Sequence, residues 1–298
     1  MKKVNIHKIQ SLLFFFFKEL NKTNINYWLD AGTLLKAHKS KFKIKSILQS
    51  SDMDLGFYFK DYKKIINFCK KIKQKGFKIK LQTGYPYFED IIKVYLPINN
   101  VNKFSHVDLY IYKLSKQKKE YYRRCVNKPF KKSLISKFLN FLIFFISWNN
   151  NKNKITKKIR DFFLTNNTKK IFCDFIFFKL YIKNATTVWT VVPQKFFSKI
   201  KKKTIKINEK KIIVKIPKNY KDYLNFRYGS LWKNNRLDWR PSDGKYLRFR
   251  KINFYKSMPL IIRDLNFNFK KYTPPSRRRN YRFNFTNQEI KKIKNNEK

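Results

Sequence analysis

Acidic residues, cysteine, glycine and proline are all scarce in this sequence of 298 residues. The chain has 18 Asp and Glu against 71 Lys and Arg, so any function that uses carboxylates must draw on a small set. The three cysteines, Cys69, Cys125 and Cys173, are odd in number, far apart and without CxxC spacing. They indicate neither a disulfide framework nor a zinc site, and this cysteine usage fits a reducing compartment.

Long hydrophobic runs are also missing. The N-terminal run LLFFFF has no small-residue cleavage site after it, so we expect a core helix rather than a secretory signal. The run at residues 134–148 is interrupted by Lys137 and Asn140 and is shorter than the roughly 20 residues of a membrane-spanning helix. It is expected either to be a buried helix or to lie in a membrane interface. The sequence favours a cytoplasmic protein, with peripheral contact with an anionic membrane left open.

Positive charge is abundant, with a formal net charge of +53. A basic surface attracts nucleic acid or anionic membranes without a specific site. Lys, Asn, Ile, Phe and Tyr dominate throughout, however, which is the bias expected of an AT-rich genome whatever the function. Both origins of the charge stay open. The apolar content of 43% excludes wholesale disorder.

The periodicity of residues 1–113 predicts an α+β fold, a mixed sheet with helices on it. The expected helices are residues 7–23, a helix that begins at Gly32, and residues 61–75, with Asp61 as cap and Gly76 as stop. The expected strands are residues 24–30, 52–59, 77–83, 90–97 and 106–112.

Two of the few carboxylates, Asp52 and Asp54, stand two residues apart in the predicted strand DMDLGFYF. Residues at this spacing project from one face of a strand, while Met53 and Leu55 face the core. Two like charges held so close need a cation, and oxygen ligands without suitably spaced His or Cys favour Mg²⁺ or Mn²⁺. Asp108 lies in the apolar alternating strand HVDLYIY, where an unpaired charge is costly. We therefore expect Asp108 to be the third ligand.

Gly32 and Thr33 lie at the junction of a predicted strand and helix, where backbone N–H groups can hold a phosphate. Followed by DxD and a third Asp, they are similar to the pattern of the nucleotidyltransferase fold, the DNA polymerase beta-like type. A non-catalytic interpretation also exists. In it Asp52 is a turn residue, Asp54 is solvated on its strand, and Asp108 pairs with a local lysine.

The stretch WLDAGTLLKAHK followed by SSDMDLGFY resembles the LicD/fukutin family of phosphotransferases. That family's signature is an apolar strand, GTLLG, a basic residue and a DxD or DxDxG strand. VVPQKFF and IPKNYKDYLNFRYGSLW are similar to its later region, a proline-led turn before a helix of the form xYLxxxYG and a Trp. The resemblance covers about residues 27–108 and 191–239, and it is closer to the fukutin-like branch than to the bacterial choline branch.

The resemblance implies transfer of a phospho-alcohol, such as phosphocholine or ribitol phosphate, from a CDP-alcohol to a glycan hydroxyl. CMP is released, and the setting is modification of a cell-surface glycan or lipopolysaccharide. Asp52, Asp54 and Asp108 would hold two metal ions, Mg²⁺ or Mn²⁺, and Asp108 would also help to deprotonate the acceptor hydroxyl. Gly32 and Thr33 would grip phosphate. The partners implied are a CDP-alcohol donor and a glycan or lipid-linked glycan acceptor, and nucleic acid is not favoured.

The chain departs from the family pattern just after GTLL. Lys36 replaces the family's glycine, and His38, followed by Lys39, replaces its arginine. The group that steadies phosphate would then be His38 or Lys39, although His38 is equally well explained as a surface helix residue. His106 is expected to point to the strand face opposite Asp108 and to be structural. For the later region, packing roles are favoured for Tyr228 and Trp232, with Gly229 as a helix stop.

Four regions are expected along the chain. The first is a nucleotidyltransferase-like catalytic core, followed by a basic, aromatic, helical insertion. The third completes the catalytic domain with a hairpin that turns at residues 208–210 and the YLxxxYG helix, and the fourth is a basic, mobile tail. Their bounds are residues 1–113, 114–183, 184–270 and 271–298.

Two rival functions stay open. The same carboxylates serve a nucleotidyltransferase that adds NMP to another acceptor. A non-catalytic polyanion-binding protein is supported by the charge, by RRRNYR near the C-terminus, and by aromatic residues interleaved with Lys. The second rival predicts binding that survives loss of Asp52 and Asp54.

Overall fold

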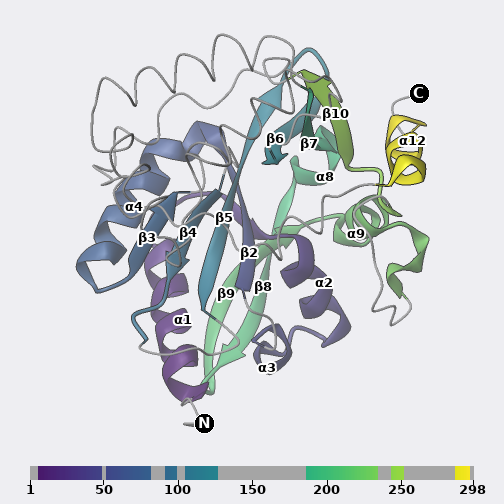
Figure 1. Cartoon of the computed structure of the whole chain (residues 1–298). Coiled ribbons are helices and arrows are strands. Elements are labelled where there is room, and N and C mark those ends of the chain that lie inside the picture. Colours follow the sequence, from purple (N-terminus) through teal and green to yellow (C-terminus); the bar gives the residue numbers. More distant parts are fainter. Residues whose placement is uncertain are drawn as a thin grey trace, which may run out of the picture.

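A computed structural model describes residues 6–48, 52–81, 91–98, 105–126, 186–233, 243–251 and 286–295. These residues form a mixed sheet of parallel and antiparallel strands with helices packed on it (Figure 1). This arrangement agrees with the α+β class expected from the sequence. No helix among the described residues is long and apolar enough to cross a membrane. The apolar run at residues 134–148 lies outside them.

The helices and strands of the described residues keep the labels of Figure 1. The helices are α1 Ile6–Asn21, α2 Ala31–Lys39, α3 Ile44–Ile47, α4 Tyr62–Gln74, α8 Gln194–Phe197, α9 Tyr220–Tyr228 and α12 Asn287–Asn295, with short 3-10 turns at η1 Phe59–Asp61 and η3 Ser230–Lys233. The strands are β1 Tyr27–Leu29, β2 Asp52–Tyr58, β3 Lys78–Leu81, β4 Ile91–Tyr95, β5 His106–Ser115, β6 Glu120–Val126, β7 Thr186–Pro193, β8 Ile200–Ile207, β9 Lys210–Pro217 and β10 Leu247–Lys251.

Strand β5 organises the sheet, and in Figure 1 it lies between β2 and β4. It pairs in parallel with β2 and antiparallel with β4, while β1 pairs antiparallel with β2. A turn after the C-terminal end of β5 leads into β6, and the sheet continues from β6 through β7 to β10. All five strands expected before residue 113 are present. Strands β8 and β9 form a separate hairpin, whose turn has positive φ at Asn208 and Glu209 as a tight hairpin turn requires.

The two faces of β2 and β5 differ in chemistry because side chains alternate along a strand. One face carries apolar residues that are almost fully buried: Met53, Leu55, Phe57, Val107, Leu109 and Ile111. Helices α1 and α4 cover this side, with the rings of Phe16 and Phe68 5.3 Å apart. The opposite face carries the acidic residues. Burial of one face thus fixes the strand orientation that presents the carboxylates on the other.

The close approach of the Trp28 indole explains why the DMDLG stretch has a glycine, Gly56, at its end. Gly56 lies opposite Trp28 in the β1–β2 register, and a Cβ added at Gly56 would lie 2.2 Å from the Trp28 indole. The indole packs against Phe197 of α8, with ring centroids 4.3 Å apart, and Phe197 contacts Tyr223 of α9. The glycine therefore lets an aromatic cluster join β1, α8 and α9 beside the acidic residues.

Two regional predictions need correction. Residues 114–126 were expected in a helical insertion, but they complete β5 and form β6, because the turn at residues 116–119 brings β6 back onto the sheet. The rest of that insertion, residues 127–183, lies outside the described residues. The 271–298 tail was expected to be mobile, yet Asn287–Asn295 is a helix and its Ile293 side chain is fully buried in a cluster with Leu247.

Candidate active site

The acidic residues come together where three strands meet. Because β2 and β5 run in parallel, their N-terminal ends coincide, and Asp54 lies opposite Asp108 while Asp52 lies opposite His106. Antiparallel β1 brings its C-terminal end to the same place, where the Asp30 N–H donates to the Asp54 carbonyl at 2.9 Å. Helix α2 starts directly afterwards. The structure therefore brings the predicted carboxylates to one place beside the N-terminus of α2.

Asp54 is the buried centre of this group. Its Oδ1 accepts a hydrogen bond from the Tyr110 hydroxyl at 2.7 Å, and its backbone N–H donates to Thr33 Oγ1 at 2.7 Å. A Cβ added at Gly32 would lie 3.5 Å from Asp54 Oδ2, so the start of α2 faces this carboxylate. Burial and the neighbouring charges of Asp52 and Asp108 raise the pKa of Asp54 to about 7. Ionisation of the Asp54 carboxyl group is therefore unfavourable unless a cation is bound beside it.

Asp108 is paired with cationic and imidazole groups of the chain itself. Lys93 donates to its Oδ1 at 3.0 Å and to its Oδ2 at 3.2 Å, and His106 Nε2 lies 3.2 Å from Oδ1. Burial alone would raise the pKa of Asp108, but the hydrogen bond with His106 and the charge of Lys93 outweigh it and lower the pKa to about 2. Asp108 is therefore ionised across the ordinary pH range and is a weak proton acceptor.

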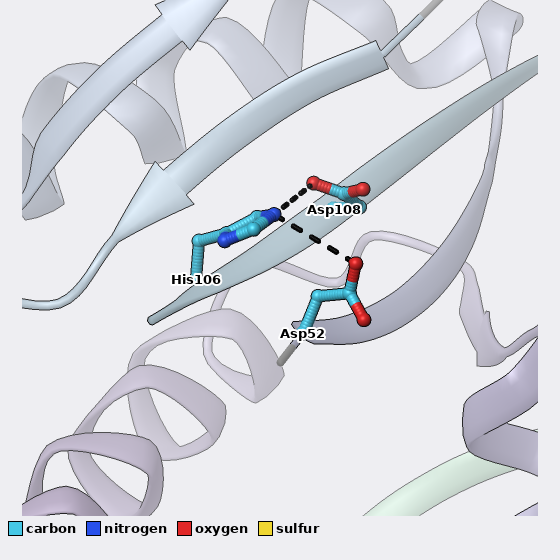
Figure 2. Close-up of side chains that lie close together, drawn as sticks. All are labelled: Asp52, His106 and Asp108. Carbon is cyan, nitrogen blue, oxygen red and sulfur yellow. Dashed lines mark ion pairs between the residues drawn. The ribbon is translucent and has the colours of Figure 1, made fainter. Parts of the chain in front are cut away.

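The orientation of the His106 side chain differs from the one predicted from the sequence. The side chain was expected to point away from Asp108, but residues two apart on a strand share a face, and Figure 2 shows the imidazole beside both carboxylates. Its Nε2 lies 3.9 Å from Asp52 Oδ2, and its Nδ1 lies 2.7 Å from Ser105 Oγ. One potential ligand atom from each of Asp52, His106 and Asp108 lies within 4.8 Å of the others. These three side chains have the spacing of a metal site.

Asp30 is a further buried carboxylate that the sequence interpretation did not single out. It caps α2 by accepting from the Ala31 N–H at 2.7 Å, and it also accepts from the hydroxyls of Tyr112 at 2.8 Å and of Tyr223. Arg227 in turn donates to the Tyr223 hydroxyl at 3.2 Å. This network ties β1, β5 and α9 together under the N-terminus of α2. The signal available in the sequence was an aspartate two residues before Gly32, at the end of the predicted strand.

A second buried arginine lies behind Tyr110. The Arg123 guanidinium of β6 stacks 3.9 Å from the centre of the Tyr110 ring, whose hydroxyl binds Asp54. Sequence reasoning missed Arg123 because its segment was assigned to an insertion. Lys93 was missed although a lysine between Ile92 and Val94 in an apolar strand is the same kind of signal that drew attention to Asp108.

The predicted phosphate-steadying residues lie further along α2. His38 Nδ1 is 3.3 Å from the Tyr220 hydroxyl, and the imidazole packs edge-on against the Trp232 ring at 5.4 Å. Burial and the charges of Lys221 and Lys39 lower the pKa of His38. The described contacts of His38 are thus with aromatic residues and not with the carboxylates. Lys39 is exposed at the last turn of α2.

Tyr228 and Trp232, the aromatic residues of the later region, occupy packing positions. Tyr228 and Trp232 are 5% and 7% exposed, in line with the packing roles favoured from the sequence. Gly229 ends α9 with φ of +75°, and a Cβ there would lie 2.6 Å from the Asp243 carbonyl oxygen. A glycine is required by both the conformation and the close approach.

The donor set fits a hard divalent cation. Asp52 and Asp54 contribute carboxylates from one strand face. Burial and the charges of Asp52 and Asp108 raise the pKa of Asp54, and a divalent ion would neutralise these charges. Asp108 differs because Lys93 already supplies it with a positive charge. Comparison with known proteins finds neither a matching family model nor a matching curated protein.

Proposed function

We propose that the protein is a metal-dependent enzyme that transfers a phosphorus-containing group from a nucleotide donor to a hydroxyl acceptor. The observation that carries the proposal is the meeting of Asp52, Asp54 and Asp108 on one face of two parallel strands, directly beside the N-terminus of α2. Catalysis of phosphoryl transfer is largely positioning and charge stabilisation, and this arrangement provides ligands for a cation next to a binding place for phosphate.

Asp52 and Asp54 are the proposed ligands of Mg²⁺ or Mn²⁺. A bound ion would neutralise the diphosphate of the donor and the charge on the leaving phosphate. The Tyr110 hydroxyl holds Asp54 Oδ1, and the Thr33 hydroxyl holds the Asp54 backbone N–H. The first contact orients the carboxylate and the second fixes the backbone at Asp54 before a ligand arrives, which reduces the ordering cost of binding.

The first turn of α2 is the proposed phosphate contact. The Ala31 N–H is already bonded to Asp30, and the Leu34 N–H to the Asp30 carbonyl, so the remaining N–H groups of this turn belong to Gly32 and Thr33. The positive end of the helix dipole adds to their attraction for an anion. Gly32 leaves room beside Asp54 Oδ2 for a phosphate oxygen, since a side chain there would begin 3.5 Å from that atom.

The proposed donor is a CDP-alcohol and the proposed acceptor is a glycan hydroxyl. Support for this finer assignment comes from the sequence, where WLDAGTLL, DMDLG and YLNFRYG resemble LicD/fukutin phosphotransferases. In the reaction, the acceptor hydroxyl loses its proton to solvent and its oxygen forms a bond to the phosphorus that carries the alcohol. The bond from that phosphorus to the bridging oxygen breaks, and CMP leaves. Because its pKa is about 2, Asp108 is assigned to orientation rather than to proton removal.

The experiment is a thermal shift panel with Mg²⁺ and CTP, CDP-choline, CDP-ribitol, CDP-glycerol, ATP and UDP-glucose. A ligand at about 100 times its dissociation constant stabilises the folded state by roughly 2.7 kcal/mol. We expect a Mg²⁺-dependent shift with one CDP-alcohol that is lost in the Asp52→Asn/Asp54→Asn protein. A shift with CTP or ATP alone would favour nucleotidyl transfer. The absence of any metal-dependent shift would contradict the proposal and favour a polyanion-binding protein.

A further inference from the structure

The Asp52, His106 and Asp108 side chains are arranged as ligands for a cation in their own right. Their ligand atoms lie within 4.8 Å of one another. The imidazole is held in the manner of a metal-binding histidine, because Nδ1 contacts Ser105 Oγ at 2.7 Å while Nε2 faces the carboxylates. In Figure 2 the imidazole and both carboxylates converge from two neighbouring strands.

The Lys93 side chain contacts this group. Lys93 lies opposite Asp108 in the register of β4 and β5, so its side chain projects from the same face of the sheet. Its Nζ is 3.0 Å from Asp108 Oδ1 and 3.1 Å from His106 Nε2. These are two of the three atoms that a cation bound to the group would need. The Lys93 side chain is 7% exposed, so the ammonium is held among these partners rather than in water.

We propose that the Lys93 ammonium takes the place of a second divalent cation, so that the folded site accepts a single ion, on Asp52 and Asp54. A divalent ion bound to Asp108 Oδ1 and His106 Nε2 would lie against an ammonium that contacts the same two atoms. Repulsion at that distance in a buried site is strong. The inference about ion number rests on the proposed function, whereas the position of Lys93 is testable without it.

A fixed cation has a chemical advantage at such a site. Transferases of this kind commonly use two metal ions, one for the attacking oxygen and one for the leaving group. Here the lysine would supply one of these positive charges permanently, with Asp108 and His106 as its anchors. Turnover should then rise with the first power of the free Mg²⁺ concentration.

The test is the number of Mn²⁺ ions bound by the full-length chain, measured by titration calorimetry and electron paramagnetic resonance. We expect one ion in the parent, two in Lys93→Met and one in Lys78→Met, a matched control at an exposed lysine of β3. The added ion in Lys93→Met should show hyperfine coupling to a ¹⁴N nucleus from His106, and the ion in the parent should show none. An unchanged ion number in Lys93→Met would overturn the inference.

The double variant Lys93→Met/Asp108→Asn separates loss of folding from loss of the ion. It removes both buried charges and one ligand, so it should fold and bind no added ion. If Lys93→Met remains unfolded in millimolar Mn²⁺ while the double variant folds, the inference is wrong, because the ion should replace the lost ammonium. A parent that binds no ion would contradict the proposed function, whereas a gain of one ion in Lys93→Met would still support the position assigned to Lys93.

Discussion

Asparagine at position 54 should make the metal-free protein more stable at alkaline pH, although it removes a proposed catalytic ligand. Burial and the charges of Asp52 and Asp108 raise the Asp54 pKa from 3.8 to about 7. The folded state therefore holds a proton that the unfolded state has lost between about pH 4 and pH 7. The stability of the folded parent should fall as pH rises through this window and stay low above it.

The magnitude follows from the size of the shift. About three pKa units at ~1.36 kcal/mol each give an upper limit of about 4 kcal/mol at pH 8. Asparagine keeps the shape of the side chain, and its amide oxygen can still accept from Tyr110. Asp54→Asn should thus exceed the parent in unfolding free energy at pH 8 by up to that amount, and should match it near pH 4.

Urea denaturation in EDTA measures the unfolding free energies of Asp54→Asn and the parent at pH 4 and at pH 8. Asp222→Asn, at an exposed position in the first turn of α9, is the matched control and should show little change with pH relative to the parent. A saturating divalent cation should reduce or reverse the advantage of Asp54→Asn, because the ion stabilises the parent. If Asp54→Asn destabilises the protein equally at both pH values, the assigned electrostatics are wrong.

Three further substitutions test other parts of the account by urea denaturation. Gly56→Ala should cost about 1–3 kcal/mol, because the added Cβ would lie 2.2 Å from the Trp28 indole, and an unchanged midpoint would contradict that packing. Asp108→Asn should cost about 3–5 kcal/mol at pH 7 by leaving Lys93 without its buried anion, and this loss should shrink as pH falls toward 2, where the parent carboxylate is itself protonated. Asp30→Ala should cost about 1–3 kcal/mol for each of its two tyrosine partners, and a loss below 1 kcal/mol would refute the network.

The carboxylate face was predictable because strand alternation is a local property. Apolar Met53 and Leu55 assign one face of β2 to the core, which leaves Asp52 and Asp54 on the other. The hairpin turn at Asn208 and the helix stop at Gly229 follow in the same way from backbone preferences of single residues. The error over His106 came from misapplying the same alternation.

What could not be predicted depends on register between distant segments. Nothing local in DIIKVYLP shows that Lys93 lies opposite Asp108, because the register of β4 on β5 is set by the fold as a whole. The same holds for Arg123, which reaches Tyr110 only after β6 folds back on β5. The polar sequence of residues 287–295 predicts a mobile tail, whereas Ile293, the buried residue of helix α12, packs in a cluster with Leu247 of β10.

The most direct test of the central claim is the product formed from a CDP-alcohol and a glycan acceptor, followed by ³¹P NMR. We expect CMP release with transfer of the phospho-alcohol in Mg²⁺, none in EDTA, and loss of turnover in a folded Asp52→Asn protein. Pyrophosphate released from CTP or ATP would instead identify a nucleotidyltransferase. Turnover that survives both EDTA and Asp52→Asn would contradict a metal-dependent site on these carboxylates.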